Sequence, residues 1–393
     1  MLLNFFAWFL GAIALVVGLY LLILESLYRR HHPANRLEMS FGTWQLTAKE
    51  PTYYQIMGEI EALNPSSVSE VMVPEITAEV KLLSNASVDG ITTTAKVVAL
   101  HSDAAARPDH YWFAYIVKSR SYTKLKVIVE ISGPGLADLQ VAWVRLHYVT
   151  YGTQGRIPKV RDVVFPFHYP TVEASKNWRS TTHAEVLPIK THLLTPLDNP
   201  IQVVKRYVVP HAQPGDIVTI GESPIAIMQG RFVHPSMVQP GWAAKRLCHL
   251  FLPTSSLATA CGMQSLIDMV GPVRVLWAFA IGAIAKALFR RPGVFYQLAG
   301  EQARLVDDVT GTLPPYDQFI VFGPEDSQRV VNDIQAATGL GAAIVDVNDL
   351  GAVKVLASTA DVALPLLKTA LAKNPAGNAD EQTPVVLIRP SSR

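Results

Sequence analysis

Acidic side chains stand close together at two places in the second half of the chain. Asp307 and Asp308 are adjacent, and Asp346, Asn348 and Asp349 follow a short apolar run. Carboxylate and amide oxygens are the ligands that hard divalent cations prefer, and α/β proteins collect ligands at the ends of buried strands. The two clusters are therefore candidate cation ligands. The alternative is structural, because Asp and Asn also form turns and an Asp pair can be a solvated helix end.

Other residue patterns associated with catalysis are weak in this sequence. No Walker loop, G-x-G-x-x-G fingerprint or H-E-x-x-H pattern occurs. Cys261 could act as a nucleophile, but no paired His lies nearby in sequence, which favours a packed or exposed thiol. The two cysteines, Cys248 and Cys261, form neither a zinc site nor a disulfide framework, and they fit a reducing compartment.

Three short motifs follow one another in the second half of the chain. They read Leu187-Pro-Ile-Lys-Thr191-His-Leu-Leu-Thr195, then Gln213-Pro-Gly215-Asp216, then Gln229-Gly230-Arg231. In order and spacing they resemble the N-terminal core of the γ-glutamyl ligases that add glutamate to the deazaflavin coenzyme F-420-0. Residues 383–389 resemble the closing strand of that family. The resemblance covers residues 186–393, the C-terminal half of the chain only.

The resemblance implies an activity and a set of site residues. Family members use GTP and a divalent metal to convert a carboxylate into an acyl phosphate, which the amino group of glutamate then attacks. The implied cofactors are a divalent metal (Mg²⁺ or Mn²⁺) and GTP or ATP. The residues implied in nucleotide binding are Lys190, Gly215, Asp216, Gly230 and Arg231. Among them, Lys190 and Arg231 are expected to face the phosphates. Residues implied in metal binding are Asp307, Asp308, Asp346, Asn348 and Asp349.

The chain departs from the family pattern where the family carries charge. Ala226-Ile-Met-Gln229 stands in place of Ser-Lys-x-Glu, and Ala352 replaces the Arg of the family's Asp-Thr-x-Gly-Arg metal motif. A hydroxyl, a cation and a carboxylate have become a methyl, a hydrocarbon and a neutral amide. Two hypotheses follow: nucleotide- and metal-dependent amide (glutamate) ligation, and a non-catalytic binding or assembly module on the same fold.

These residues belong to the last of three predicted parts of an α+β chain: a membrane anchor at 1–33, an all-β sandwich at 34–185 and an α/β ligase-like domain at 186–393. Alternating apolar residues predict sandwich strands at 77–83, 92–100, 111–117, 124–131 and 140–148, in an immunoglobulin-like arrangement. In the last part we expect strands at 216–220, 319–322, 342–346 and 384–388. Helices are expected at 327–338, with Ser327 as its cap, and at 363–373.

The N-terminus is apolar from residue 2 to residue 24 apart from Asn4, and Arg29-Arg30-His31-His32 follows. About 20 apolar residues at ~1.5 Å rise span a hydrocarbon core of ~30 Å, which predicts a transmembrane helix. A signal peptide is the alternative, but no Lys or Arg precedes the run and no small-x-small cleavage site stands before Arg29. The basic flank places the bulk of a single-pass protein in the cytoplasm. Membrane lipid is the expected partner; a membrane-protein partner and a homodimer are left open.

A second apolar segment covers residues 270–289, interrupted by Arg274 and Lys286 and followed by Arg290-Arg291. It could lie in the membrane interface, form a core helix or span the bilayer. Spanning would put residues 186–268 and 292–393 on opposite sides, although neither looks like a complete domain.

Composition excludes several classes of protein. Apolar residues make up 49% and charged residues 17%, which excludes a disordered chain. Lys plus Arg is 34 and Asp plus Glu is 32, so the charge balance predicts no nucleic-acid partner.

Overall fold

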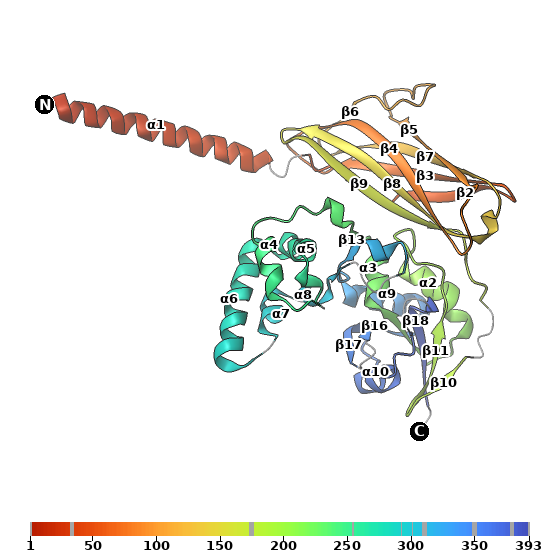
Figure 1. Ribbon diagram of the computed structural model, residues 1–393. Helices are drawn as coiled ribbons and strands as arrows, with labels where there is room; N and C mark the ends of the chain where they lie inside the picture. Colours follow the sequence, from red (N-terminus) through yellow and green to blue (C-terminus); the bar gives the residue numbers. More distant parts are fainter. Residues whose placement is uncertain are drawn as a thin grey trace. The chain divides into compact units, whose positions relative to one another are not determined.

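The computed structural model describes residues 2–31, 35–172, 177–253, 255–291, 293–300, 302–308, 313–347, 352–377 and 381–391 (Figure 1). At residues 2–7, 29–31, 307 and 308 this description covers the backbone only. The chain divides into two compact units: Met1–Val80, Gly90–Pro134 and Arg145–Asp162 form the first, and Lys81–Asp89, Gly135–Val144 and Val163–Arg393 the second. The domain boundaries expected after residues 33 and 185 stay predictions.

The N-terminal segment is one continuous helix, α1 (Leu2–His31). Its stretch Trp8–Tyr28 has a mean hydropathy of 2.3, and no part of it is buried in the protein. By length and composition α1 can cross a membrane, a property that it shares with signal sequences.

Two antiparallel sheets form the β-sandwich (Figure 1). One has the order β1-β3-β7-β5 with β2 paired to β3, and its strands are β1 (Glu38–Met39), β2 (Thr43–Glu50), β3 (Tyr53–Asn64), β5 (Thr92–Leu100) and β7 (Ser121–Ser132). The other has the order β6-β4-β8-β9, with β4 (Val71–Ser84), β6 (Tyr115–Val117), β8 (Leu139–Gly152) and β9 (Gly155–Pro166). Alternate residues of β3 and β7 are buried, as strands with one solvated face require. The predicted sandwich is confirmed.

Four strands of the sandwich, β1, β2, β3 and β9, were not predicted, and one prediction was too long. The strand expected at 111–117 is confirmed only over β6 (Tyr115–Val117). The latter error has a physical cause: Trp112 is buried in an irregular segment, where its indole N–H donates to the Val73 carbonyl at 2.9 Å. An apolar aromatic can therefore be part of the core without belonging to a strand.

A six-stranded mixed sheet follows in the order β10-β11-β18-β12-β16-β17. Its strands are β10 (Arg179–Ser180), β11 (Ala184–Ile189), β12 (Ile217–Gly221), β16 (Gly341–Val347), β17 (Val353–Ser358) and β18 (Val385–Pro390). β12 and β16 are parallel, and the other pairings are antiparallel. Three of the four predicted strands coincide with β12, β16 and β18 to within two residues. The fourth is β15 (Ile320–Val321), which pairs with β13 (Phe232–Val233) and β14 (Asp307–Asp308) in a separate small sheet.

Helices cover both faces of the mixed sheet. α2 (Pro200–Tyr207) and α9 (Ser327–Thr338) pack against Val218 and Ile344, whereas α10 (Leu364–Leu371) packs against Ile217 and Val345. Neighbouring residues of one strand thus enter opposite layers, which explains why these strands are apolar without alternation.

The helix predicted at 327–338 is confirmed, but its cap is not. Ser327 is the first helical residue, and Asp326 occupies the cap position without a side-chain cap bond. Asp326 has φ 46, in the left-handed region, whereas a capping side chain needs extended backbone at that position.

The remaining helices form a separate cluster with its own core. α4 (Ala244–Leu247), α5 (Ala260–Val270), α6 (Pro272–Phe289), α7 (Val294–Ala299) and α8 (Gln302–Leu305) contribute buried side chains such as Met263, Leu266 and Val275. α6 corresponds to the second apolar segment. Only 11% of it is buried, which excludes a fully enclosed core helix.

Candidate functional site

A cavity of about 330 Å³ lies at one edge of the mixed sheet. β11, β12 and β16 all run in the same direction, because β18 is antiparallel to β11 and β12 and β16 is parallel to β12. Their C-terminal ends therefore meet at this edge. Residues at or beyond these ends line the cavity, among them Thr191, Gly221 and Asp346. This is the place where α/β sheets bind ligands.

Two acidic side chains line the cavity. Glu222, which opens α3 (Glu222–Met228) directly after β12, and Asp346 of β16 are the carboxylates among its described lining residues, and none of these residues is Lys or Arg. Neutral polar lining comes from Ser223, Asn374 and Gln382. Such a lining favours a ligand that brings a positive charge or hydrogen-bond donors.

A buried donor also lines the cavity. Tyr316 is 1% exposed and packs edge-on against Phe232 at 5.3 Å between ring centroids. Its hydroxyl has no hydrogen-bond partner among the described residues. Burial, together with the charge of Asp198, raises the pKa of Tyr316 well above its usual range, so the hydroxyl stays protonated. A buried donor without a partner costs about 1–3 kcal/mol, which a ligand acceptor can recover.

His192 lines the cavity as well, but its ring is held on both sides. Nδ1 lies 2.8 Å from the Tyr207 hydroxyl and Nε2 lies 2.9 Å from an Asp198 carboxylate oxygen. Asp198 is itself fixed, since its other oxygen accepts from the Thr195 backbone N–H at 2.9 Å. With both ring nitrogens bonded, His192 shapes the wall of the cavity and orients its neighbours. His192 belongs to a quoted motif but had no predicted role, and Tyr316 and Glu222 were not predicted.

Asp216, implied in nucleotide binding by the resemblance, is engaged within the protein. It is 2% exposed, and its two carboxylate oxygens accept from Nε and Nη2 of Arg389 at 3.0 and 2.7 Å. These bonds raise the pKa of the Arg389 guanidinium. Gly215, just before it, has φ +92, which disfavours any residue with a Cβ. Lys190 is exposed at the end of β11. The nucleotide-binding role of these residues stays a prediction.

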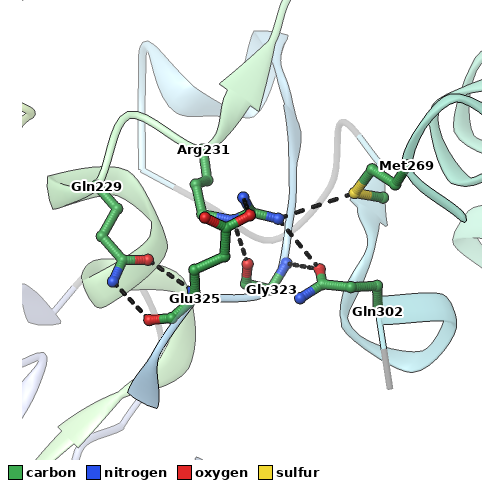
Figure 2. Close-up of polar contacts among 6 residues, drawn as sticks. All are labelled: Gln229, Arg231, Met269, Gln302, Gly323 and Glu325. Atoms are coloured by element: carbon green, nitrogen blue, oxygen red, sulfur yellow. Dashed lines mark hydrogen bonds and ion pairs between the residues drawn. The ribbon is translucent and has the colours of Figure 1, made fainter. Parts of the chain in front are cut away.

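Arg231 is the centre of a cluster of polar contacts (Figure 2). Its Nε donates to the Gly323 carbonyl at 2.6 Å, Nη1 forms an ion pair with Glu325, and Nη2 lies 3.5 Å from the Gln302 side-chain oxygen. Gln229 exchanges two hydrogen bonds of 2.8 Å with the backbone of Glu325. Arg231 therefore joins the segment after α3 to the 323–325 segment and to α8. Its role towards phosphate stays a prediction.

The apolar departures from the family pattern agree with burial. Ala226, Ile227 and Met228 are all buried in α3, and Gly230 follows with φ +71. Ile227, which stands at the family's Lys position, also lines the cavity, so an apolar side chain replaces the family's cation at the cavity wall. This part of α3 therefore contributes packing and not charge in this chain.

The acidic clusters can be traced only in part. Asp346 lines the cavity, as expected for a residue at a strand end. Asp307 and Asp308 form β14, but their side chains are not described, and Asn348 and Asp349 lie outside the described residues. Among the described residues no group of three or more His, Cys, Asp or Glu side chains could hold a metal ion. The described donors alone do not fit a metal site, and the predicted metal set stays a prediction.

Comparison with known proteins gives one family. Residues 38–169 match the family model described as "F420-0:gamma-glutamyl ligase, N-terminal Ig-like domain". No curated protein sequence matches.

Similar solved structures cover the chain in part. They include the GAE domain of yeast GGA1 (12% identity, 33% of this chain and 91% of that one, TM-score 0.20). The GAE domain of GGA2p from Saccharomyces cerevisiae has 6% identity, 33% and 89% coverage and a TM-score of 0.20. The CupB6 tip adhesin from Pseudomonas aeruginosa has 10% identity, 33% and 50% coverage and a TM-score of 0.22. These scores are too low to carry an argument.

The family match corrects one expectation. It lies in the β-sandwich, whereas the motifs confined the resemblance to residues 186–393. The sandwich carries its signal in strand patterning, which many unrelated sandwiches share, so single motifs could not identify it. Residues 38–169 are thus similar to the N-terminal Ig-like domain of the F420-0:gamma-glutamyl ligase family.

Proposed function

We propose that this chain is a membrane-anchored ligand-binding protein of the gamma-glutamyl ligase family. In this proposal α1 is the anchor, and residues 186–393 form a ligase-like domain that binds a small amino acid in its cavity. The Ig-like domain at 38–169 and the motifs between Leu187 and Arg231 support the family, and the length and hydropathy of α1 support the anchor.

The proposed ligand class rests on one observation: hydrogen-bond acceptors and a buried hydrogen-bond donor line the same cavity. Glu222 and Asp346 supply negative charge, which an amino group would neutralise. Tyr316 supplies a buried, protonated hydroxyl, which would donate a hydrogen bond to a ligand carboxylate. A molecule with both groups is an amino acid. The volume of about 330 Å³ lies near the lower end of the range for small-molecule sites.

The carboxylates that line the cavity favour amino-acid binding over phosphoryl transfer. A phosphoryl group in transfer needs positive charge around it. The described lining has no Lys or Arg, and the Asp216 and Arg231 side chains are bonded to Arg389 and Glu325.

A second candidate is GTP- or ATP-dependent amide ligation with a divalent metal. It is supported by Asp346, which belongs to the acidic motif and lines the cavity at the end of β16. In that case Asp346 would act with Asn348 and Asp349, and with Asp307 and Asp308, on a metal that holds the nucleotide phosphates.

One experiment separates the two candidates. Thermal unfolding of the full chain in detergent is measured with L-glutamate, L-lysine or butylamine, and with GTP or ATP plus Mn²⁺ or Mg²⁺. A ligand at a hundred times its Kd stabilises by ~2.7 kcal/mol, a shift of several degrees. We expect a shift with an amino acid that is reduced in Asp346→Asn and in Tyr316→Phe. Asp333→Asn, a half-exposed carboxylate on α9, is the matched control.

The outcomes are distinct. A metal-dependent shift with a nucleotide that disappears in Asp346→Asn would support ligation instead. A chain that responds to neither amino acids nor nucleotides would refute the proposed ligand class.

The anchor is tested separately. The mature protein is recovered from membranes after alkaline carbonate washing, and its N-terminus is sequenced. Retention in the membrane with residues 2–24 intact supports the anchor, and removal of those residues would identify a signal peptide.

A further inference from the structure

The helix α6 is apolar on the side that the protein leaves uncovered. Its buried residues, Val275, Ala278 and Gly282, lie on one side at about 100° per residue. The opposite side, here called the α6 outer face, consists of apolar residues that are 43–73% exposed: Val273, Leu276, Trp277, Ile281, Ile284 and Leu288. A surface helix of a water-soluble domain normally has the reverse pattern.

The covered side of α6 is firmly packed on α7 (Figure 1). At Gly282 a Cβ atom would come within 3.0 Å of the Phe295 backbone nitrogen, so the helices approach closely there. Arg274 turns its charge towards the protein, since its Nε donates to the Leu298 carbonyl at 3.0 Å. Because its own domain occupies one side of α6 along the helix, only the opposite side can meet another surface.

We propose that the α6 outer face inserts into the interface of a lipid bilayer, as a second membrane contact of this chain. The occupant of this face is the acyl-chain region just below the headgroups, which in-plane helices reach at a depth of about 5–10 Å. Trp277 is suited to this depth because indole rings concentrate at membrane interfaces. The proposal rests on the anchoring by α1 in the proposed function, which brings a bilayer to this chain.

Charge at the end of α6 identifies lipid as the occupant. Lys286, Arg290 and Arg291 are exposed, and α6 contains no Asp or Glu. Basic residues beside an apolar stripe bind the phosphate of anionic headgroups while the stripe enters the acyl region. A second copy of this chain would instead bring the same cations against one another, which like-charge repulsion disfavours.

The test uses the full chain in nanodiscs with one copy per disc. The discs contain anionic lipid and phosphatidylcholine brominated either near the headgroup end or near the methyl end of the acyl chains. Bromine quenches tryptophan on contact, so the quenched part of the emission is compared between the wild type and Trp277→Phe. Trp44→Phe, which removes a sandwich tryptophan, is the matched control.

Trp277 emission is taken as the difference between the wild type and Trp277→Phe. We expect bromine to quench this emission at least twofold, and bromine near the headgroups to quench it more than bromine near the methyl ends. Ile284→Trp in the Trp277→Phe background should report the same depth, because an in-plane helix keeps both positions level. Ile284→Lys with Leu288→Lys, both exposed positions, should abolish the quenching of Trp277 while the circular dichroism of the chain stays unchanged.

Two results would overturn the proposal. Unquenched Trp277 in a disc that retains the chain would exclude lipid contact, and cross-linking of the chain into dimers in detergent would then identify a second copy as the occupant. Deeper quenching at residue 284 than at 277 would show a spanning helix. A chain that leaves the discs on alkaline washing would instead refute the anchor itself, so failure of the two proposals is distinguishable.

Discussion

Replacing Asp216 by Asn should destabilise the second unit even when no ligand is present. The carboxylate is 2% exposed and bonds the Arg389 guanidinium through two oxygens, at 3.0 and 2.7 Å. The pair links the start of β12 to the end of β18, two strands that are neighbours in the mixed sheet. The substitution keeps the size of the side chain but leaves the guanidinium against a neutral amide.

The magnitude follows from the surroundings of the pair. Removing one partner of a buried ion pair costs about 3–5 kcal/mol. The Arg389 side chain is 25% exposed, and it retains a bond to the His211 carbonyl and its stacking on Trp178. We therefore expect a loss near the lower limit, about 3 kcal/mol, or roughly 6–12 °C in Tm for a unit of this size.

The assay is urea unfolding of the full chain in detergent, followed by circular dichroism. Glu185→Gln is the matched control, because Glu185 is an exposed carboxylate that lies opposite Arg389 in the sheet. The control should lose less than about 0.5 kcal/mol. A loss below about 1 kcal/mol for Asp216→Asn would refute the structural role. A stable variant that no longer responds to GTP would show that Asp216 serves a nucleotide instead.

Three further predictions concern single side chains. Arg231→Met should lower the free energy of unfolding in urea by about 2 kcal/mol, because it leaves the Gly323 carbonyl without its donor. Glu325→Gln, on the exposed side of the same ion pair, should lower it by less than about 1 kcal/mol. Equal losses for the two variants would contradict this prediction. Tyr316→Phe should leave the Tm of the ligand-free protein unchanged or raise it, since the lost hydroxyl has no partner among the described residues; a clear fall in Tm would reveal a partner. Burial lowers the pKa of His101, so the unfolded state binds more protons and the sandwich should lose stability as pH falls below about 6.5. His101→Gln should flatten the dependence of Tm on pH between 7 and 5, and an unchanged slope would assign that dependence to other groups.

Sequence patterning predicted the strands and helices that carry a strong apolar pattern of their own. β12, β16 and β18 were found because they are continuous apolar runs, and α6 was found because it is apolar apart from Arg274 and Lys286. The short helices around residues 244–305 were missed, since each is stabilised by the shared core around Met263 and Leu266 rather than by its own sequence.

The candidate site was predicted only where chemistry and strand ends coincide. Asp346 lines the cavity near the end of β16, the kind of position where ligands were expected, and its role as a metal ligand stays a prediction. Tyr316 and Glu222 could not be predicted as cavity residues. A single Tyr or Glu in the sequence does not show that the fold will bury the Tyr hydroxyl or place the Glu in the cavity wall. Asp216 illustrates the converse: a motif residue whose carboxylate binds Arg389, 173 positions away in sequence.

The cluster around Arg231 has a mechanical consequence. One guanidinium contacts the 323–325 segment, Gln302 of α8 and the sulfur of Met269 in α5, while its own backbone follows α3, whose first residue lines the cavity (Figure 2). Arg231 thus couples the helical cluster to the 323–325 segment, beside the Gly323–Gln302 hydrogen bond and the packing of Ile320 into the helical core. Because α3 leads from the cavity to Arg231, this contact gives a change in the helical cluster a direct route to the cavity wall.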